Sequence, residues 1–295
     1  MSSRSSTYLE CNDRLTVNSQ TVFVVRKCEN CDLVFMSPKP DDKSMQLAYA
    51  TDGYDPFQSL QSPTSIFDRA YRKARDFTIS WKKSLIQGLI PHGSRILDGG
   101  CGTGEFINSL KDHYHVEGYE PELKVAAWVQ DQYELSIHAG DSSTFPSDIE
   151  NFDLITMWHV LEHVPDPVTE LHRLGGILNS GGKLLIAVPN ITSADAMIYG
   201  SNWVALDAPR HLWHFSKKQI SLLAGRTGFK LLKSGMLPLD VYYNSILSEK
   251  NCIAQSGFSQ LALTPFRLPF SIISSILYGM FTGKHSSNYY VLEKK

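Results

Sequence analysis

The sequence predicts an α/β fold in which a doubly wound sheet carries helices on both faces. Two observations lead to this prediction. Short apolar segments alternate with longer segments of helical periodicity between residues 94 and 232, and such alternation is typical of strands joined by crossover helices. The apolar segments also hold few polar residues, as expected of strands that are buried on both faces.

Each predicted element has its own local signal. The predicted strands are apolar runs that end near turn residues: 95–98, 115–120, 135–138, 152–157, 183–188, 229–232 and 288–292. The predicted helices carry apolar residues at intervals of three and four: 62–90, 105–114, 122–133, 166–178 and 216–226. Pro189 ends the fifth strand because proline cannot donate to a ladder. Ser216 is a favourable N-cap for the last of these helices.

Two segments lie outside this alternation. Residues 21–25 and 33–36 are rich in β-branched and aromatic residues around a tight turn, so they predict a small N-terminal β hairpin. Residues 238–285 are apolar with few charges and predict a helical insertion before the last strand. We therefore divide the chain into a hairpin segment 1–60, a core 61–237, the insertion 238–285 and a final strand 286–295.

The composition is that of an ordinary globular protein, with 42% hydrophobic and 20% charged residues. The 28 basic and 30 acidic residues give a net charge of −2. The chain thus lacks the surplus of positive charge that would indicate a nucleic-acid partner. The first seven residues are polar and no apolar run follows them, so we expect no signal peptide and a cytoplasmic location. Five cysteines in that setting do not predict a disulfide framework.

A glycine-rich segment, 98–104, lies directly between the first predicted strand of the core and a helix. Glycines there let the backbone turn sharply and approach a ligand, because no Cβ atoms stand in the way. Glu120 ends the next strand, where a carboxylate can accept both hydroxyls of a ribose. The segment therefore predicts a site for a nucleoside-bearing cofactor.

Two alternatives compete with that prediction. A dinucleotide site would need a third glycine where this sequence has Glu105, and a glutamate there would repel a pyrophosphate at the helix start. A turn that only packs strand against helix would not need an acidic residue at the end of both strands. A ligand with one carboxylate, one amine and one ribose fits best.

Residues 96–106 resemble the first motif of the class I S-adenosylmethionine-dependent methyltransferases. Further likenesses follow in the family's order over about residues 91 to 235: Glu120-Pro121, 140–142, 152–167 and 178–184. The small-molecule branch, with quinone-precursor O-methyltransferases and enzymes of cell-surface sugar pathways, is the most similar. The resemblance implies a Rossmann-like sheet of seven strands and S-adenosylmethionine as cofactor. Gly99 departs from the pattern, since the family often has a larger apolar residue there.

The resemblance also implies roles for single residues. Asp98 would lie near the cofactor amine, Glu120 would bind the ribose, and Asp141 would accept from the adenine amino group. Trp158 and His159 would line the floor near the sulfonium. The full set of expected cofactor contacts is Asp98, Gly99, Gly100, Cys101, Gly102, Gly104, Phe106, Glu120, Pro121, Asp141, Ser142, Trp158 and His159.

Catalytic candidates lie after the fourth strand and in the loop 207–216. A base is needed only if the acceptor must lose a proton, and His159, His163 and His211 are candidates, with His214 beside them. Arg210 is a candidate for binding a phosphate or carboxylate of the acceptor. The loop can equally be a well-packed segment before a helix.

The segment 159–163 has a second interpretation. In quinone-branch relatives the positions of His159, Glu162 and His163 can carry metal-binding side chains, with an acid where this sequence has His159. A divalent ion there could orient a diol. Alternatively, Glu162 and His163 hydrogen-bond the backbone and fix the turn.

Cys28 and Cys31 have the spacing of half a zinc ribbon, and Cys11 is the remaining cysteine of the N-terminal segment. Three cysteines leave a fourth ligand unassigned, so a degenerate knuckle without zinc is favoured over a zinc site. The apolar stretch 258–281 predicts a helical lid or a dimer contact. An interfacial membrane segment that reaches a lipid-linked acceptor is the alternative.

We therefore expect methyl transfer from S-adenosylmethionine to a small molecule, in first place a saccharide or other cell-envelope precursor. A quinone precursor is the second acceptor class. A non-catalytic S-adenosylmethionine-binding scaffold protein is the alternative of another class, and the glycine spacing disfavours a nicotinamide-dependent oxidoreductase.

Overall fold

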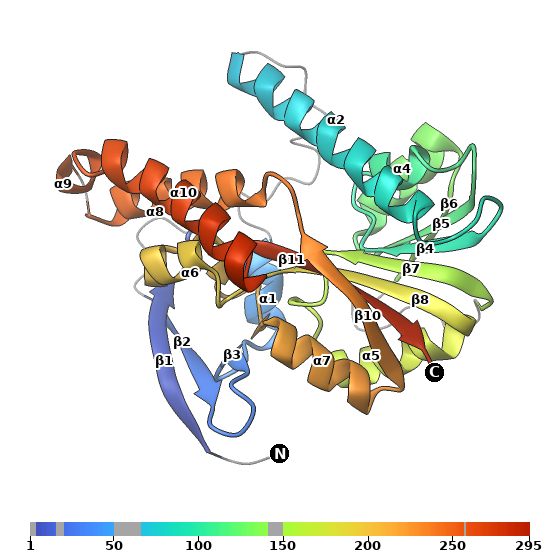
Figure 1. The fold of residues 1–295 in the computed structure, drawn as a ribbon, viewed down its shortest axis with the longest axis horizontal. Coiled ribbons are helices and arrows are strands. Elements are labelled where there is room, and N and C mark those ends of the chain that lie inside the picture. Colours follow the sequence, from blue (N-terminus) through green and yellow to red (C-terminus); the bar gives the residue numbers. More distant parts are fainter. Residues whose placement is uncertain (1–3, 16–20, 50–65, 141–149, 257) are drawn as a thin grey trace.

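The computed structural model describes residues 4–15, 21–49, 66–140, 150–256 and 258–295. Its centre is a seven-stranded sheet (Figure 1). From one edge to the other, the strands are β10 (Phe229–Met236), β11 (Ser287–Lys294), β8 (Leu178–Pro189), β7 (Phe152–Trp158), β4 (Arg95–Gly99), β5 (His115–Glu120) and β6 (Ser136–Ala139). The five strands from β8 to β6 run parallel, and β11 is antiparallel to both its neighbours. The predicted doubly wound sheet is confirmed.

Helices cover both faces of this sheet (Figure 1). α5 (Pro167–Ile177) and α7 (Lys217–Arg226) pack on one face, and α2 (Ile66–Gln87), α3 (Glu105–Asn108) and α4 (Leu123–Tyr133) pack on the other. The chain also forms α1 (Asp42–Tyr49), α6 (Ala194–Tyr199) and 3₁₀ turns at Gly200–Asn202 and Val204–Leu206. Ser216 and Gln219 form a capping box at the start of α7, as the N-cap prediction requires. The helix predicted over 105–114 is shorter: α3 ends at Asn108, and the chain continues in tight turns in which Leu110 N donates to Ile107 O and His113 N donates to Leu110 O, both at 3.0 Å.

The N-terminal β structure is larger than the predicted hairpin. β1 (Ser5–Asn12), β2 (Val22–Cys28), β3 (Val34–Met36) and β9 (Trp213–His214) form a four-stranded antiparallel sheet. β9 belongs to the loop 207–216, and it pairs Val34 with His214 and Phe35 with Trp213. This long-range pairing joins the N-terminal segment to the core. The sequence division at residue 60 stays a prediction.

Apolar side chains fill both faces of the central sheet. One cluster, which includes Leu97 and Ile155, packs beneath α5 and α7; the other, which includes Ile96 and Leu154, packs beneath α2 and α4. These four side chains are fully buried, and each contributes about 1.5–3 kcal/mol of hydrophobic stabilisation. Successive side chains of β4 and β7 thus pack alternately into the two clusters. This packing fixes both strands in the sheet, with their carboxyl ends side by side.

The helical insertion consists of α8 (Asp240–Ser256), α9 (Phe258–Leu261) and α10 (Thr264–Thr282). Its helical character confirms the sequence prediction. The three helices lie together at the end of the molecule farthest from β4, β5 and β6 (Figure 1). In the part of the chain that the structure describes, no helix combines the length and apolar character needed to cross a membrane.

Candidate active site

The glycine-rich turn follows β4 at the carboxyl end of the sheet. Gly100, Gly102 and Gly104 have φ angles of 71°, 52° and 71°, in the left-handed region that favours glycine. A Cβ on Gly100 would approach Val160 Cγ2 to 2.6 Å, and one on Gly104 would approach Val129 Cγ1 to 2.4 Å. Among the described residues, a Cβ on Gly102 would meet nothing within 4 Å. Gly100 and Gly104 therefore permit close packing, whereas Gly102 leaves space for a ligand.

Asp98 lies near the end of β4 and is only 3% exposed. Its Oδ1 accepts a hydrogen bond from Thr156 Oγ1 at 2.5 Å. Burial raises the pKa of Asp98 to about 7, although Thr156 and Lys82 act in the opposite direction. A buried carboxylate of this kind is stabilised by a cation beside it. The site thus suits a ligand that carries an ammonium group.

Glu120 ends β5, the strand next to β4. Its Oε2 accepts a hydrogen bond from Gly102 N at 2.9 Å, and its Oε1 accepts one from Glu122 N at 3.1 Å. Burial raises the pKa of this carboxyl, and the two backbone hydrogen bonds oppose the shift. A carboxylate offers about four lone-pair positions. Glu120 therefore keeps acceptor capacity for ribose hydroxyls beside the open face of Gly102.

An aromatic wall stands beside the glycine turn. Phe106 and Trp81 contact the ring of Trp158 edge to face, with centroid distances of 5.5 Å and 6.4 Å. Trp158 is 9% exposed, and its indole N–H has no hydrogen-bond partner among the described residues. Because buried indole N–H groups normally find an acceptor, this group is available to a ligand or a water molecule.

Lys82 of α2 was missed in the sequence reasoning. Its ammonium lies 4.2 Å from the centroid of the Trp158 ring and 5.4 Å from that of Phe106. Burial lowers the pKa of Lys82 to about 8, while the charges of Asp98 and Asp240 act in the opposite direction. The lysine thus brings a cation into the same site as the carboxylate of Asp98, where it can pair with a ligand carboxylate.

The other expected cofactor contacts have simpler surroundings. Gly99 is buried in β4, and Pro121 follows β5 in the turn before α4. Burial raises the pKa of the Cys101 thiol, and the backbone N–H of Cys101 donates to Tyr119 O at 3.0 Å, so its expected cofactor contact stays a prediction. Asp141 and Ser142 lie outside the described residues, and their expected adenine contacts stay predictions.

His159 follows β7 in a left-handed conformation, with φ of 58°. Its Nε2 lies 3.2 Å from Asp240 Oδ2, and its Nδ1 lies 3.5 Å from Glu162 Oε1. Burial opposes protonation, but these two carboxylates outweigh burial and raise the pKa of His159 to about 10. Asp240 is the first residue of α8, so the helical insertion reaches the site. No sequence signal pointed to that contact.

Glu162, His163 and His211 form a cluster beside His159. One potential ligand atom of each residue lies within 4.8 Å of those of the other two. Among the described residues, these three side chains form a group that could hold a metal ion. Glu162 is 1% exposed, and neither of its carboxylate oxygens has a hydrogen-bond partner in the described chain. Its charged partner is His159, at 3.5 Å, so a ligand or an ion could still supply the hydrogen bonds or coordination that this buried carboxylate lacks.

The two imidazoles of the cluster are held by backbone carbonyls. His211 Nδ1 lies 2.8 Å from Ala205 O, and His163 Nδ1 lies 3.1 Å from Arg210 O and 3.1 Å from Tyr49 Oη. A ring whose Nδ1–H donates to a carbonyl keeps Nε2 as an acceptor, which is the usual arrangement of a metal-binding histidine. These three side chains are thus of the kind that can hold a divalent cation.

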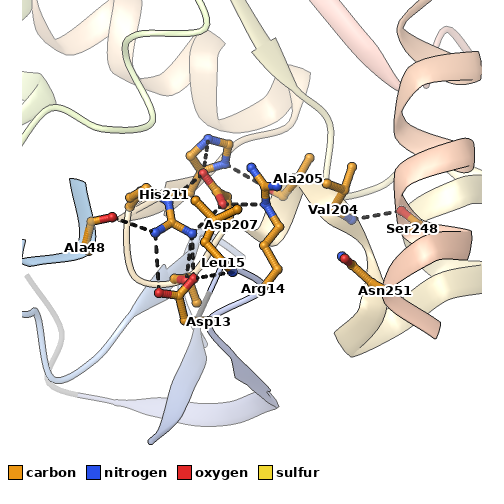
Figure 2. A network of polar contacts seen from close by, with 12 residues as sticks. Asp13, Arg14, Leu15, Ala48, Val204, Ala205, Asp207, His211, Ser248 and Asn251 are labelled. Atoms are coloured by element: carbon orange, nitrogen blue, oxygen red, sulfur yellow. Dashed lines mark hydrogen bonds and ion pairs between the residues drawn. The ribbon is translucent and has the colours of Figure 1, made fainter. Parts of the chain in front are cut away.

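Arg210 is fully buried and has internal partners. Its Nη2 lies 2.7 Å from Asp13 Oδ1 and 2.9 Å from Asp207 Oδ1, and its Nη1 donates to Ala48 O at 3.1 Å. Burial opposes the charge, but the two carboxylates outweigh it and raise the pKa of Arg210. Figure 2 shows Asp13, Asp207 and Ala48 converging on this point. These bonds satisfy the Arg210 guanidinium within the protein, so its expected contact with the methyl-acceptor molecule stays a prediction.

His214 lies in β9 and is buried near His211, with a ring centroid distance of 6.4 Å. Burial, together with the charge of His211, lowers the pKa of His214 to about 3. The imidazole is therefore neutral at physiological pH. His214 pairs with Val34 of the N-terminal sheet. The loop 207–216 therefore contacts the N-terminal sheet as well as the core.

The three cysteines considered as zinc ligands do not meet. Cys11 pairs with Phe23 in the β1–β2 ladder, whereas Cys28 pairs with Ser5 at the other end. Cys28 lies five residue positions beyond Phe23 along β2, which is roughly 16 Å, and two thiolates on one zinc lie less than about 5 Å apart. Cys11 therefore cannot share a metal with Cys28 and Cys31, which corrects the three-cysteine ligand set.

Known proteins share this fold and part of this sequence. A family model described as "Methyltransferase domain" matches residues 48–234. A ubiquinone biosynthesis O-methyltransferase of Coxiella burnetii is 32% identical over 114 residues, which cover 37% of this chain and 49% of that protein. The chain thus spans about half the length of this curated relative.

Two solved structures illustrate what the fold alone supports. Magnesium protoporphyrin IX methyltransferase from Synechocystis, with bound S-adenosylhomocysteine, has a TM-score of 0.54 at 13% identity, over 86% of this chain and 100% of that chain. The 4+2 cyclase SpnF has a TM-score of 0.50 at 15% identity, over 79% of this chain and 84% of that chain. The match of the family model is the stronger finding: the chain belongs to the methyltransferase domain family, which confirms the resemblance to class I S-adenosylmethionine-dependent methyltransferases.

Proposed function

We propose that this chain transfers the methyl group of S-adenosylmethionine to a hydroxyl oxygen of a small molecule that carries two neighbouring hydroxyl groups. The observation that carries the proposal is the position of the segment after β7. Trp158 faces the cofactor residues, and four residues later Glu162 begins the cluster with His163 and His211. Cofactor and acceptor groups would therefore meet at one turn.

The cofactor half offers a partner for each polar part of S-adenosylmethionine. Glu120 would accept the ribose hydroxyls, Asp98 would face the amine, and Lys82 would pair with the carboxylate. Phe106 and Trp158 supply an apolar surface near the sulfonium. This distribution of one cation and two carboxylates suits a zwitterionic amino acid joined to a nucleoside.

The reaction asks for alignment and for removal of one proton. A sulfonium methyl is already activated, so holding the acceptor oxygen in line with it supplies much of the rate. His159 is protonated at neutral pH because its pKa is raised to about 10, and it therefore cannot accept a further proton. His163 is neutral, since burial and the charge of His211 lower its pKa to about 4. We assign the hydroxyl proton to the free ring nitrogen of His163 in the site without a metal ion.

A divalent ion would be the alternative to this use of His163, because a ring nitrogen that binds a metal ion cannot accept the hydroxyl proton. Glu162, His163 and His211 would hold it, and it would supply a positive charge that makes a hydroxyl more acidic and orients a diol. His159 would hold the Glu162 carboxylate in place from the other side.

Two acceptor classes carry neighbouring hydroxyls: saccharides, including cell-envelope precursors, and quinone precursors. The name of the Coxiella relative supports the second class and oxygen as the methylated atom. The N-terminal sheet and the helical insertion support a distinct acceptor, because they lie largely outside residues 48–234. The shared diol chemistry is what we propose.

A screen with radiolabelled S-adenosylmethionine tests the proposal, with saccharide, lipid-linked and quinol fractions as separate arms. We expect label in a diol-bearing product, and much less label with the Glu120→Ala variant at the same cofactor concentration. Calorimetry with S-adenosylhomocysteine and with NAD forms the control on the cofactor. Binding of NAD alone would refute the proposal.

A non-catalytic cofactor-binding role is the second candidate function, because the 4+2 cyclase shows that this fold is not confined to methyl transfer. It would be favoured if S-adenosylhomocysteine binds but no fraction gains label. Metal analysis then tests whether the cluster binds a metal ion. Purified wild type should hold about one divalent ion, and a His211→Ala variant should hold none and show no thermal shift on addition of metal.

A further inference from the structure

Helix α10 packs with the opposite polarity to an ordinary surface helix. The residues that it buries against the body are Ser271, Ser275 and Gly279. The residues that it exposes are large and apolar: Phe266 at 76%, Phe270 at 62%, Ile273 at 57%, Leu277 at 49%, Met280 at 70% and Phe281 at 86%. A helix on a protein surface normally turns such residues inward. We call this set of six the α10 apolar face.

Polar contacts fix the rotation of α10, so the apolar face cannot turn inward. Ser275 Oγ donates to Asp195 Oδ1 at 3.2 Å, and the hydroxyls of Ser271 and Ser245 lie 3.1 Å apart. A Cβ on Gly279 would come within 2.3 Å of His285 Nδ1. The small residues therefore let the helix backbone approach the body closely.

The one arginine of α10 fixes the same rotation. Arg267 binds Glu249 of α8 through two nitrogens, at 2.8 Å and 2.9 Å. Its charge is thus directed toward the body and away from the apolar face.

The area of the apolar face exceeds what a monomer normally exposes. Large side chains of this kind present about 150–250 Å² each, so their exposed fractions leave on the order of 700 Å² uncovered. Monomers rarely expose contiguous apolar patches above about 300–600 Å². A standard interface buries about 800 Å² on each partner. The face is therefore of the size that one side of a stable dimer needs.

The spacing and charge of the face point to another helix as its occupant. The residues 266, 270, 273, 277 and 280 follow intervals of four and three, which keep one seam toward a partner helix. An anionic lipid surface would favour basic residues around the face. Arg267 is turned inward, and Lys284 beyond the helix end donates to Tyr278 Oη at 3.3 Å.

We propose that a second copy of this chain covers the α10 apolar face, so that two α10 helices cross antiparallel on a twofold axis. An isologous contact requires a surface that complements itself, and this seam does. With Ile273 on the axis, it would meet Ile273 of the partner subunit, while Phe266 would lie opposite Met280 and Phe270 opposite Leu277. The same contact would place α8, whose Asp240 binds His159, beside the dimer interface.

Sedimentation equilibrium of the full chain tests the proposal. We expect wild type to be a dimer that dissociates on dilution, and Phe270→Glu to be a monomer, because each copy would bury one unpaired carboxylate opposite Leu277 of the partner subunit. Leu123→Glu is the matched control, since Leu123 is 65% exposed on α4 at a distance from α10, and it should remain a dimer. Binding of S-adenosylhomocysteine verifies that each variant is folded.

A cysteine at the axis gives an independent readout. Ile273→Cys should form a disulfide between copies under mild oxidation, whereas Leu123→Cys and wild type should not. A wild type that is monomeric at every concentration would overturn the proposal, as would a Phe270→Glu dimer of unchanged stability. Flotation of monomeric wild type with phosphatidylglycerol–phosphatidylethanolamine vesicles would instead assign the face to a membrane.

Discussion

The proposed cofactor half and the proposed acceptor half of the site are built in different ways. The cofactor half comes from two neighbouring strand ends, with Asp98, the glycine turn and Glu120 within 23 residues of sequence. The acceptor half combines Asp13 of the segment after β1, Ala48 of α1, the segment after β7 and the loop 207–216. One half is local in sequence, and the other is assembled by long-range contacts.

This difference teaches where each half derives its stability. The glycine turn is held by its own backbone, since Gly100 N and Cys101 N both donate to Tyr119 O, at 2.8 Å and 3.0 Å. The acceptor loop depends on buried charges, because Arg210 connects Asp13 to Asp207 (Figure 2). Removing one member of a buried ionic network leaves an uncompensated charge. The acceptor half should therefore be the more sensitive to single changes far from the chemistry.

The largest expected effect follows from Arg210→Met. The change leaves Asp13 and Asp207 buried without their cation, so the free energy of unfolding should fall by about 3–5 kcal/mol. Urea denaturation measures it. The control is Arg95→Met, whose half-exposed guanidinium pairs with Glu117 at 2.7 Å and should cost about 1 kcal/mol or less. Equal losses in the two variants would show that the network does not stabilise the acceptor half.

Glu120→Ala should have the largest effect on the cofactor half. Loss of a charged acceptor for two ribose hydroxyls should weaken S-adenosylhomocysteine binding on the order of 100-fold, with little change in unfolding free energy. Calorimetry provides the affinity. Glu117→Ala is the control on the same strand, because Glu117 faces Arg95 and His138. If Glu120→Ala binds as tightly as Glu117→Ala, Glu120 does not contact the ribose.

Lys82→Met should weaken S-adenosylhomocysteine binding about tenfold, because a charge-assisted contact of about 1.5 kcal/mol is lost. Methylthioadenosine, which lacks the amino-acid carboxylate, should bind the variant and wild type equally. Lys83→Met is the adjacent control, since Lys83 Nζ donates to Ser109 O at 2.9 Å. An equal loss for both ligands would mean that Lys82 supports the aromatic wall and not the carboxylate.

The smallest expected effect is a pH dependence of cofactor affinity. Asp98, with its pKa raised to about 7, attracts the cofactor amine only when deprotonated, so affinity should fall as pH decreases below about 7. Lys82, with its pKa lowered to about 8, attracts the carboxylate only when protonated, so affinity should also fall as pH rises above about 8. The charges of the bound ligand favour deprotonated Asp98 and protonated Lys82, so they extend the pH range of tight binding beyond both limits.

The Asp98→Asn variant assigns the acidic limb of that profile. It should bind more weakly at neutral pH and lose the decrease in affinity below about 7, while the alkaline limb remains. Calorimetry across pH with S-adenosylhomocysteine measures both limbs. An unchanged acidic limb in Asp98→Asn would place the titrating group elsewhere.

Local sequence was sufficient for much of the fold. The apolar runs in 95–98 and 152–157 predicted β4 and β7, because strands buried on both faces are mostly apolar. The short segment 115–120, which ends at Glu120, predicted β5. Lys82 also had a signal that was passed over: it interrupts the apolar positions around Trp81 and Leu85 of α2. A lysine on the apolar side of a helix needs a partner inside the protein.

Other features had no local signal. Nothing in the sequence around Asp13 or Asp240 indicates that they would bind Arg210 and His159, since those partners lie far away in the chain. β9 has only two residues, and pairing with Val34 and Phe35 defines it. Such pairings depend on how remote segments pack.

The sequence by itself determined the sheet, the glycine turn and the acidic ends of two strands, because periodicity and glycine conformation act over a few residues. Only the tertiary structure decided which charges are paired. In the folded chain Arg210 is buried and pairs with Asp13 and Asp207, Cys11 lies far from Cys28, and Glu162, His163 and His211 lie together. The physical reason is that ion pairing and burial depend on distance in space, which a linear pattern does not specify.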